Sequence, residues 1–306
     1  MLLPESLKKG DTIGIIAPSH WIEKQDMEDM NKAILLMEGS GFSIQFGRHV
    51  FCNTTGYGPT AKQKAQDIED MFLNPKIKMI FCAKGGYNSN TTFEYIHPEI
   101  IQKNPKILCG FSDSTSLLNF IYSQTGLVTF HGPTFKSLVS WETEYGYQQI
   151  MHRLVEKGLS LKQPQDVFRV IREGVAQGRL IGGNLSLFSQ MVTGAYGMDV
   201  SNKILFLEES GQEANAEQVS NYFYHMKQNG VFDQIAAIWL GSYEGVEKIP
   251  IEKILLDCIE QQYTFPIIVS DNFGHIDKKM VIPIGTLAKI DTNQSEMIQL
   301  QEGCIL

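Results

Sequence analysis

The sequence predicts an α/β protein with two domains, an N-terminal Rossmann-like domain with a parallel sheet and a β-rich C-terminal domain. Short apolar runs alternate with segments of helical spacing over residues 1–150, which is typical of βαβ units. Apolar runs of strand length then predominate over residues 178–306. A chain of 306 residues can hold two domains of ordinary size.

Five apolar runs of the first domain are predicted to be strands. They lie at residues 12–17, 42–46, 78–83, 107–109 and 127–130. Apolar residues at helical spacing predict one helix over 24–37 and another from Thr60, as its N-cap, to Phe72, with a stop at Asn74–Pro75. A further helix is expected directly after Ser112, where Leu117 and later apolar residues follow the same spacing.

The second half begins after a polar segment. Residues 148–155 suit a helix, and residues 151–177 are predicted to connect the two domains because residues 157–174 are polar and show no clear period. Helical patterns over 216–228 and 251–261 then lie among the strand-like runs. Those runs cover 178–184, 204–207, 235–240, 266–269, 280–284, 286–291 and 297–300.

Composition narrows the function classes. The formal net charge is −8 and the pI about 5.4, and no basic run is present, which argues against nucleic acid or an anionic membrane as partner. The five cysteines are dispersed without paired metal-ligand spacing, which favours a reducing compartment and no metal site. The residues from Met1 to Glu5 do not begin a secretory signal, and no apolar run is long enough for a bilayer, so we expect a cytoplasmic protein.

Three loops leave the carboxyl ends of predicted first-domain strands, where parallel sheets bind ligands. They are Pro18–His20, Gly85–Asn88 and Gly110–Asp113. Because the carboxyl ends of parallel strands share one edge of the sheet, we expect these loops to converge on one crevice.

The third of these loops has the layout of a nucleophile elbow. An apolar run ends at Gly110, Ser112 follows two residues later, and a helical pattern begins at once. Such a turn lifts the serine Oγ clear of the backbone and points the next N–H groups toward an oxyanion. Ser114 stands where the G-x-S-x-G pattern has its second glycine. The alternative is a strand–helix junction in which Ser112 or Asp113 only caps the helix.

A serine nucleophile needs a base, and the base needs an orienting acceptor. Of the seven histidines, His20, His131 and His275 follow predicted strands, where a scaffold can hold an imidazole. Glu208 and Glu209 end the apolar run 204–207. Either could accept from a histidine, and the alternative is that both are solvated strand-end charges.

Taken in order along nearly the whole chain, these segments resemble the LD-carboxypeptidase family, which includes murein tetrapeptide carboxypeptidases and microcin C immunity peptidases. The segments that carry the resemblance are Gly10–Ser19, Gly85–Tyr87, Gly110–Asp113, His131–Pro133, Gly182–Leu185, Leu207–Glu209, Asp271–His275 and Pro283–Gly285.

The resemblance implies a Ser–His–Glu triad and an acyl-enzyme, without cofactor or metal. Ser112 would be the nucleophile, His275 the general base, and Glu208 the acid that orients it, with Glu209 as the alternative. The backbone N–H groups of Gly86 and Asp113 would form the oxyanion hole.

The same resemblance implies that Gly85 and Tyr87 contact substrate. It also implies an active site between the two domains and a homodimer.

The family leaves two substrates open, both small. One is murein tetrapeptide, cleaved at the LD-amide before its terminal D-alanine. The other is a peptidyl- or aminoacyl-nucleotide, for which Glu244, after an apolar strand, would bind the polar end. The segment from Ala83 to Asn88 departs from the Ala-Arg-Gly-Gly-Tyr-Gly form of the murein type and is closer to the microcin immunity branch. A nucleotide-binding module without catalysis is disfavoured because the glycine fingerprints of such modules are absent.

Overall fold

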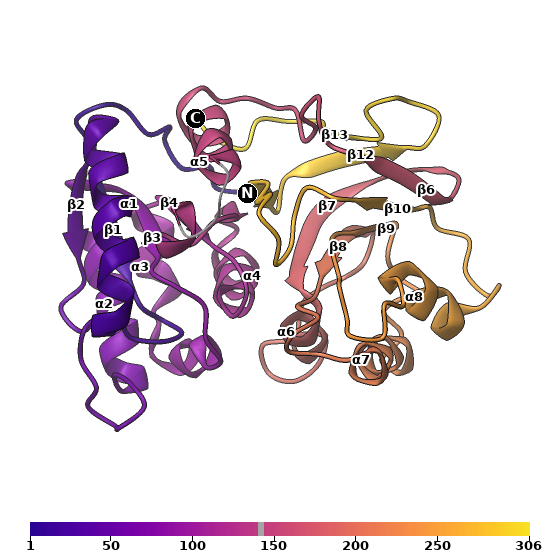
Figure 1. Cartoon of the computed structure of the whole chain (residues 1–306), viewed down its shortest axis with the longest axis horizontal. Coiled ribbons are helices and arrows are strands. Elements are labelled where there is room, and N and C mark those ends of the chain that lie inside the picture. The colour runs from indigo at the N-terminus through magenta and orange to yellow at the C-terminus, as the bar shows by residue number, and fades with distance from the viewer. Residues whose placement is uncertain (140–143) are drawn as a thin grey trace. The chain divides into compact units, whose positions relative to one another are not determined.

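The computed structural model describes residues 1–139 and 144–306, which form two compact units (Figure 1). The first unit contains Met1–Gly158 together with Val281–Pro283 and Cys304–Leu306. The second contains Leu159–Met280 and Ile284–Gly303. Each unit is built around its own sheet.

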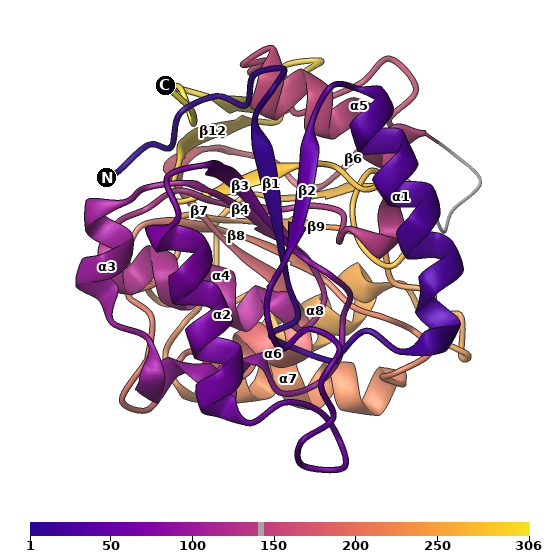
Figure 2. The same ribbon diagram turned by 90° about the vertical axis from the view of Figure 1, so that its left-hand side faces the viewer.

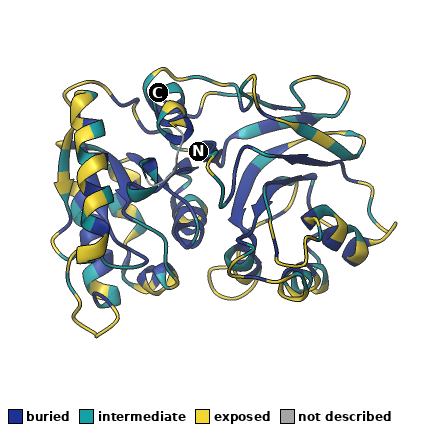
Figure 3. Ribbon diagram, in the orientation of Figure 1, coloured by how far each residue is buried: buried dark blue, intermediate teal, exposed yellow. Residues whose placement is uncertain are grey.

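The first sheet has the strand order β11-β5-β4-β3-β1-β2. Its strands are β1 (Thr12–Ile16), β2 (Ser43–Phe46), β3 (Ile77–Cys82), β4 (Ile107–Gly110), β5 (Thr129–His131) and β11 (Ile282–Ile284). Every pair from β2 through to β5 is parallel, which confirms the predicted Rossmann-like sheet. Strands β3, β4 and β5 are buried along most or all of their length (Figure 3).

Helices cover both faces of this sheet. Figure 2 shows α1 on one side and α2 and α3 on the other, as expected when the strand order reverses after β2. The helices are α1 (Met27–Gly39), α2 (Ala61–Leu73), α3 (Pro98–Lys103), α4 (Ser114–Thr125) and α5 (Tyr145–Ile150). Short 3₁₀ segments lie at Lys24–Asp26, Ser89–Tyr95 and Lys136–Leu138, and a π-helical turn at Met151–Val155. Thr60 caps α2 as predicted, since its side chain accepts from the Gln63 N–H at 3.2 Å.

The second unit is a mixed seven-stranded sheet in the order β13-β12-β7-β8-β9-β10-β6. The central strands β7 to β10 are parallel, and the outer strands run antiparallel to their neighbours. The strands are β6 (Phe168–Arg172), β7 (Val175–Asn184), β8 (Lys203–Glu208), β9 (Ala237–Leu240), β10 (Ile267–Ser270), β12 (Leu287–Asp291) and β13 (Ile298–Leu300). The helices are α6 (Leu185–Gln190), α7 (Ala216–Gln228) and α8 (Ile251–Ile259).

Two segments differ from their predicted places. Within the predicted connection 151–177, Phe168–Arg172 forms β6 at the edge of the second sheet. Its residues are only half-buried or exposed, so the segment lacks the apolar pattern of a core strand. The run 280–284 contributes β11 to the first sheet rather than to the second. The sequence could not predict this, because a fully buried apolar strand does not indicate which sheet it joins.

No helix in the described ranges combines the length and apolar character needed to span a bilayer.

Candidate active site

The turn between β4 and α4 is a strained elbow with Ser112 at its apex. Ser112 has φ +58°, a left-handed conformation that is uncommon for a residue other than glycine and is concentrated at functional sites. The Thr115 N–H donates to the Ser112 carbonyl at 2.8 Å, so the helix starts immediately. Asp113 is the N-cap residue of α4, but its side chain makes no hydrogen bond to the helix. The alternative in which the Asp113 side chain caps the helix is therefore not supported.

The loop after β3 lies against the elbow. A methyl group on Gly85 would lie 3.3 Å from both Cβ and Oγ of Ser112, a tight contact that glycine avoids without any shift of either loop. The Asp113 carboxylate accepts from the Ser89 N–H at 2.8 Å, and the Ser89 hydroxyl donates to the Asp113 carbonyl at 2.7 Å. Burial raises the pKa of Asp113.

The loop after β1 completes the convergence. A methyl group on Gly86 would lie 3.0 Å from Ser19 Cβ and 3.1 Å from His20 Cβ. The three strand-end loops therefore meet at one edge of the first sheet, as the sequence predicted. Tyr87, one of the predicted substrate contacts, projects from this edge with 80% of its surface exposed.

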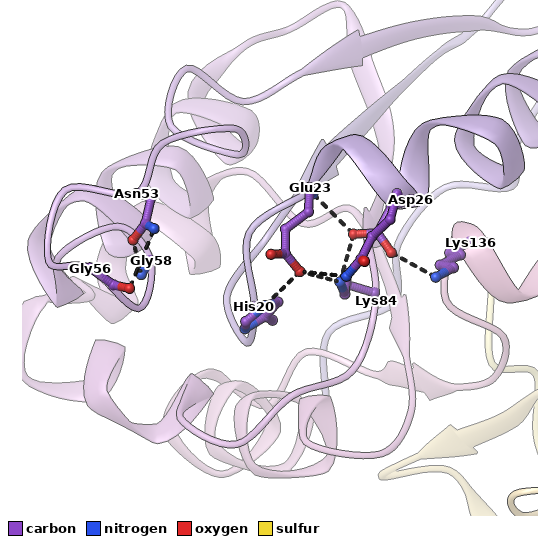
Figure 4. A network of polar contacts seen from close by, with 9 residues as sticks. His20, Glu23, Asp26, Asn53, Gly56, Gly58, Lys84 and Lys136 are labelled. Atoms are coloured by element: carbon purple, nitrogen blue, oxygen red, sulfur yellow. Dashed lines mark hydrogen bonds and ion pairs between the residues drawn. The ribbon is translucent and has the colours of Figure 1, made fainter.

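A buried charged cluster anchors two segments beside these loops (Figure 4). Asp26, 1% exposed, accepts from the ammonium groups of Lys84 and Lys136, each at 2.6 Å. Burial alone would raise the pKa of Asp26, but the hydrogen bonds from both lysines outweigh it and lower this pKa. His20, a candidate base, instead contacts Glu23 at 3.2 Å through its Nε2 atom, and His131 is buried at the end of β5.

Lys64 on α2 lies close to these loops but is not among the site residues predicted from the sequence. It is 4% exposed, and its Nζ donates to the Ser19 carbonyl at 3.1 Å and to Asn88 Oδ1 at 2.5 Å. A signal was present, because Lys64 shares the helical spacing of the buried residues Ile68, Met71 and Phe72. A lysine at an apolar-stripe position is rarely fully buried without partners.

The second unit brings Glu208 and His275 together. Glu208 ends β8 and is completely buried, and its Oε2 lies 2.7 Å from Nδ1 of His275 in the loop after β10. Burial alone would lower the pKa of His275, but the charge of Glu208 and its hydrogen bond outweigh burial, so this pKa is raised. The bond also favours the tautomer with Nδ1 protonated and Nε2 available to accept a proton.

The loop that carries His275 is held by close packing at Gly274 and by hydrogen bonds from Lys279. Gly274 has φ +126°, and a methyl group there would lie 2.1 Å from Ser242 Oγ and 3.3 Å from Glu208 Oε2. The Lys279 ammonium, 3% exposed, donates to the carbonyls of Gly274 and Ile276 on either side of His275, at 3.3 and 2.5 Å. Burial lowers the pKa of Lys279 to about 8.

Glu209 has a different place from the one expected of a solvated neighbour. It is 2% exposed and accepts three hydrogen bonds of 2.8 Å, from Asn184 Nδ2 and from the N–H groups of Ser186 and Ser210. The alternative that both acids are solvated is therefore wrong, because the chain is still buried directly after β8, the strand between β7 and β9. Glu209 therefore ties β8 to the start of α6, and burial raises its pKa.

Glu244 lies in the exposed loop after β9, as predicted. It lines two hollows of the second unit, of about 200 and 550 Å³. Among the described residues, no cluster of three or more histidine, cysteine or acidic side chains suits a metal ion.

Known protein families and individual proteins are similar to this chain in both of its halves. The model of the LD-carboxypeptidase N-terminal domain matches residues 13–132, and that of the C-terminal domain matches residues 177–290. A probable murein peptide carboxypeptidase of Bacillus subtilis (strain 168) is 28% identical, with 96% of this chain and 93% of the relative covered. The microcin C7 self-immunity protein MccF of Escherichia coli is 27% identical, with 95% and 93% covered.

A solved structure extends the similarity to the whole fold. MccF in complex with glutamyl sulfamoyl guanosine matches with a TM-score of 0.91 and 25% identity, and each chain is covered completely. Both halves of the chain thus match one family of hydrolases in a single order. The chain belongs to the LD-carboxypeptidase family and is a serine carboxypeptidase.

Proposed function

We propose that this enzyme hydrolyses its substrate through a triad in which Ser112 is the nucleophile, His275 the general base and Glu208 the orienting acid. The observation that carries the proposal is the 2.7 Å contact between Nδ1 of His275 and the buried carboxylate of Glu208. A carboxylate in that place holds one tautomer of the imidazole and stabilises the imidazolium formed during proton transfer. The strained turn at Ser112 supports the other half of the proposal.

The proposed reaction proceeds in two stages. Ser112 Oγ attacks the carbonyl carbon while His275 Nε2 takes the hydroxyl proton. The imidazolium then gives this proton to the leaving amine, and the C–N bond breaks to leave an acyl-enzyme. Water, deprotonated by His275, attacks the ester and releases the acid and free Ser112.

The charge that develops on the carbonyl oxygen needs donors. We assign them to the backbone N–H groups of Gly86 and Asp113. The close approach of Gly85 to Ser112 and the two hydrogen bonds between Ser89 and Asp113 support this assignment, since they bring both loops to the nucleophile. Donors fixed before the reaction stabilise the transition state without reorganisation.

For the substrate, we propose the LD-amide before the terminal D-amino acid of murein tetrapeptide. The name of the Bacillus subtilis relative supports this choice. In this reading Gly85 and the exposed Tyr87 contact the peptide beside Ser112. The products are a D-amino acid and a shortened murein peptide, and the reaction serves peptidoglycan recycling.

A second substrate class has its own support, a peptidyl- or aminoacyl-nucleotide amide. The MccF structure with glutamyl sulfamoyl guanosine covers this whole chain, and the 550 Å³ hollow beside Glu244 is wide enough for a polar group. In this reading Glu244 binds the polar end of the nucleotide.

A competition assay separates the two substrates. The enzyme is incubated with equal concentrations of murein tetrapeptide and an aminoacyl sulfamoyl adenosine, and both products are followed by mass spectrometry. Faster release of D-alanine supports the murein assignment, and faster release of the free sulfamoyl adenosine supports the alternative. Cleavage of neither by the wild-type enzyme, under conditions where it is folded, contradicts both.

A further inference from the structure

The buried ammonium group of Lys64 contacts two of the three loops that meet at Ser112. Lys64 is 4% exposed, and burial lowers its pKa while the charge of Asp113 acts in the opposite direction. The proposed reaction gives Lys64 no role. Burying a charge is costly unless its partners compensate it, so the partners of Lys64 indicate what this charge does.

The contacts of Lys64 reach the backbone around both proposed oxyanion donors. Its Nζ donates at 3.1 Å to the carbonyl of Ser19, the residue on which Gly86 packs. The second bond, 2.5 Å long, goes to Asn88 Oδ1. Asn88 directly precedes Ser89, whose two hydrogen bonds hold Asp113.

We propose that Lys64 is a positioning residue that sets the spacing of the Gly86 and Asp113 N–H groups. This inference rests on the proposed function, in which those groups stabilise the oxyanion. Lys64 does not touch the reacting atoms. Its hydrogen bonds to Ser19 and Asn88 keep the loops after β1 and β3 in one position relative to the elbow after β4.

The chain supplies a matched control for a purely structural role. Lys106 is also a buried lysine of the first unit, 7% exposed, and burial lowers its pKa to about 8. Its Nζ donates to the carbonyls of Met71 and Asn74 at the C-terminal end of α2, whereas Lys64 lies in the first turn of that helix. Removing either ammonium takes away two hydrogen bonds from a buried lysine, but of the two lysines Lys64 alone is bonded to the strand-end loops.

The test compares Lys64→Met with Lys106→Met by steady-state kinetics and thermal unfolding. We expect Lys64→Met to lower kcat roughly 10- to 100-fold with KM unchanged, because misplaced oxyanion donors weaken binding of the transition state and not of the substrate. Lys106→Met should lower the melting temperature similarly and leave kcat unchanged. A wild-type kcat in Lys64→Met, or an equal loss of kcat in both variants, overturns the proposal.

A second variant covers the case in which Lys64→Met does not fold. Asn88→Ala removes one partner of Lys64 from a half-exposed loop position. It should lower kcat several-fold with KM unchanged, and a wild-type kcat in this variant overturns the proposal. Failure of the wild-type enzyme to cleave either substrate overturns the proposed function and this inference together. Wild-type cleavage with unchanged kcat in these variants overturns this inference alone.

Discussion

The carboxyl ends of the two sheets hold the proposed catalytic groups, Ser112 and His275, in different ways. At the first sheet, Ser112 is placed by main-chain geometry, a left-handed turn beside which Gly85 has little room for a methyl group. At the second sheet, His275 is placed by a side chain, the buried carboxylate of Glu208. Substitutions near Ser112 should therefore act through shape, and substitutions near His275 through charge.

The largest effect is expected from Ser112→Ala. Removing the nucleophile should lower kcat by roughly 10³-fold or more, because the covalent route is lost. The thermal unfolding curve should stay close to that of wild type, since no core cavity is created. Measured turnover on the preferred substrate checks this, and normal turnover would refute the serine mechanism.

The charge on Glu208 should come next. Glu208→Gln keeps the volume but removes the charge, so kcat should fall strongly, though less than in Ser112→Ala. The base must be neutral, and Glu208 raises the pKa of His275. Activity of the wild type should thus fall as pH decreases through a value above the ordinary pKa of histidine, and Glu208→Gln should move this acid limb to lower pH.

A substitution of Lys279 should shift the pH profile in the direction opposite to that of Glu208→Gln. Its positive charge lowers the pKa of His275, so Lys279→Met should move the acid limb to higher pH. Profiles of kcat/KM against pH for the three proteins measure both shifts. Movement of the two variants in the same direction would contradict the assignment of His275 as the base.

A smaller loss is expected where shape alone changes. In Gly85→Ala the new methyl group would lie 3.3 Å from Ser112 Oγ, so one of the two loops must shift by a few tenths of an ångström. We expect kcat to fall roughly 10-fold without movement of the acid limb. A shifted pH profile with unchanged kcat at the optimum would show that the two regions do not differ as described.

Glu209→Ala should have the smallest effect on activity and a clear effect on stability. It leaves two buried donors and one part-buried donor without their acceptor, which costs on the order of 3 kcal/mol in the free energy of unfolding. Turnover per folded molecule should remain near wild type, as urea unfolding and kinetics together will show. Glu209→Gln, which keeps an acceptor, should be less destabilised. Loss of activity in Glu209→Ala with normal activity in Glu208→Ala would reverse the roles of the two acids.

The sequence predicted best what local chemistry decides. The Thr60 cap, the helix Ala216–Gln228 and the turn after Gly110 each depend on residues close in the chain, and the structure has them where expected. The strands that precede Glu208 and His275 are also where the sequence placed them, whereas the pairing of these two side chains was implied only by the family resemblance.

Long-range packing decided what the sequence could not predict. Two neighbouring carboxylates at one strand end look alike in a sequence, and only the position of Asn184 and Ser186 makes Glu209 a structural acceptor. The helical spacing of Lys64 indicates that it is buried, but its partners Ser19 and Asn88 lie far away in the sequence and could not be predicted from that spacing. Burial of a polar side chain depends on partners that are distant in the chain.

The central claim is that Ser112 and His275 act together, as nucleophile and general base of one reaction. A double-mutant cycle tests it most directly, with kcat measured for Ser112→Ala, His275→Ala and the combined variant on one substrate. Residues that work as a unit give grossly non-additive losses. The account predicts that each single variant loses roughly 10³-fold or more and that the double variant loses little beyond either. Losses that multiply in the double variant would show that the two residues act independently and would contradict the account.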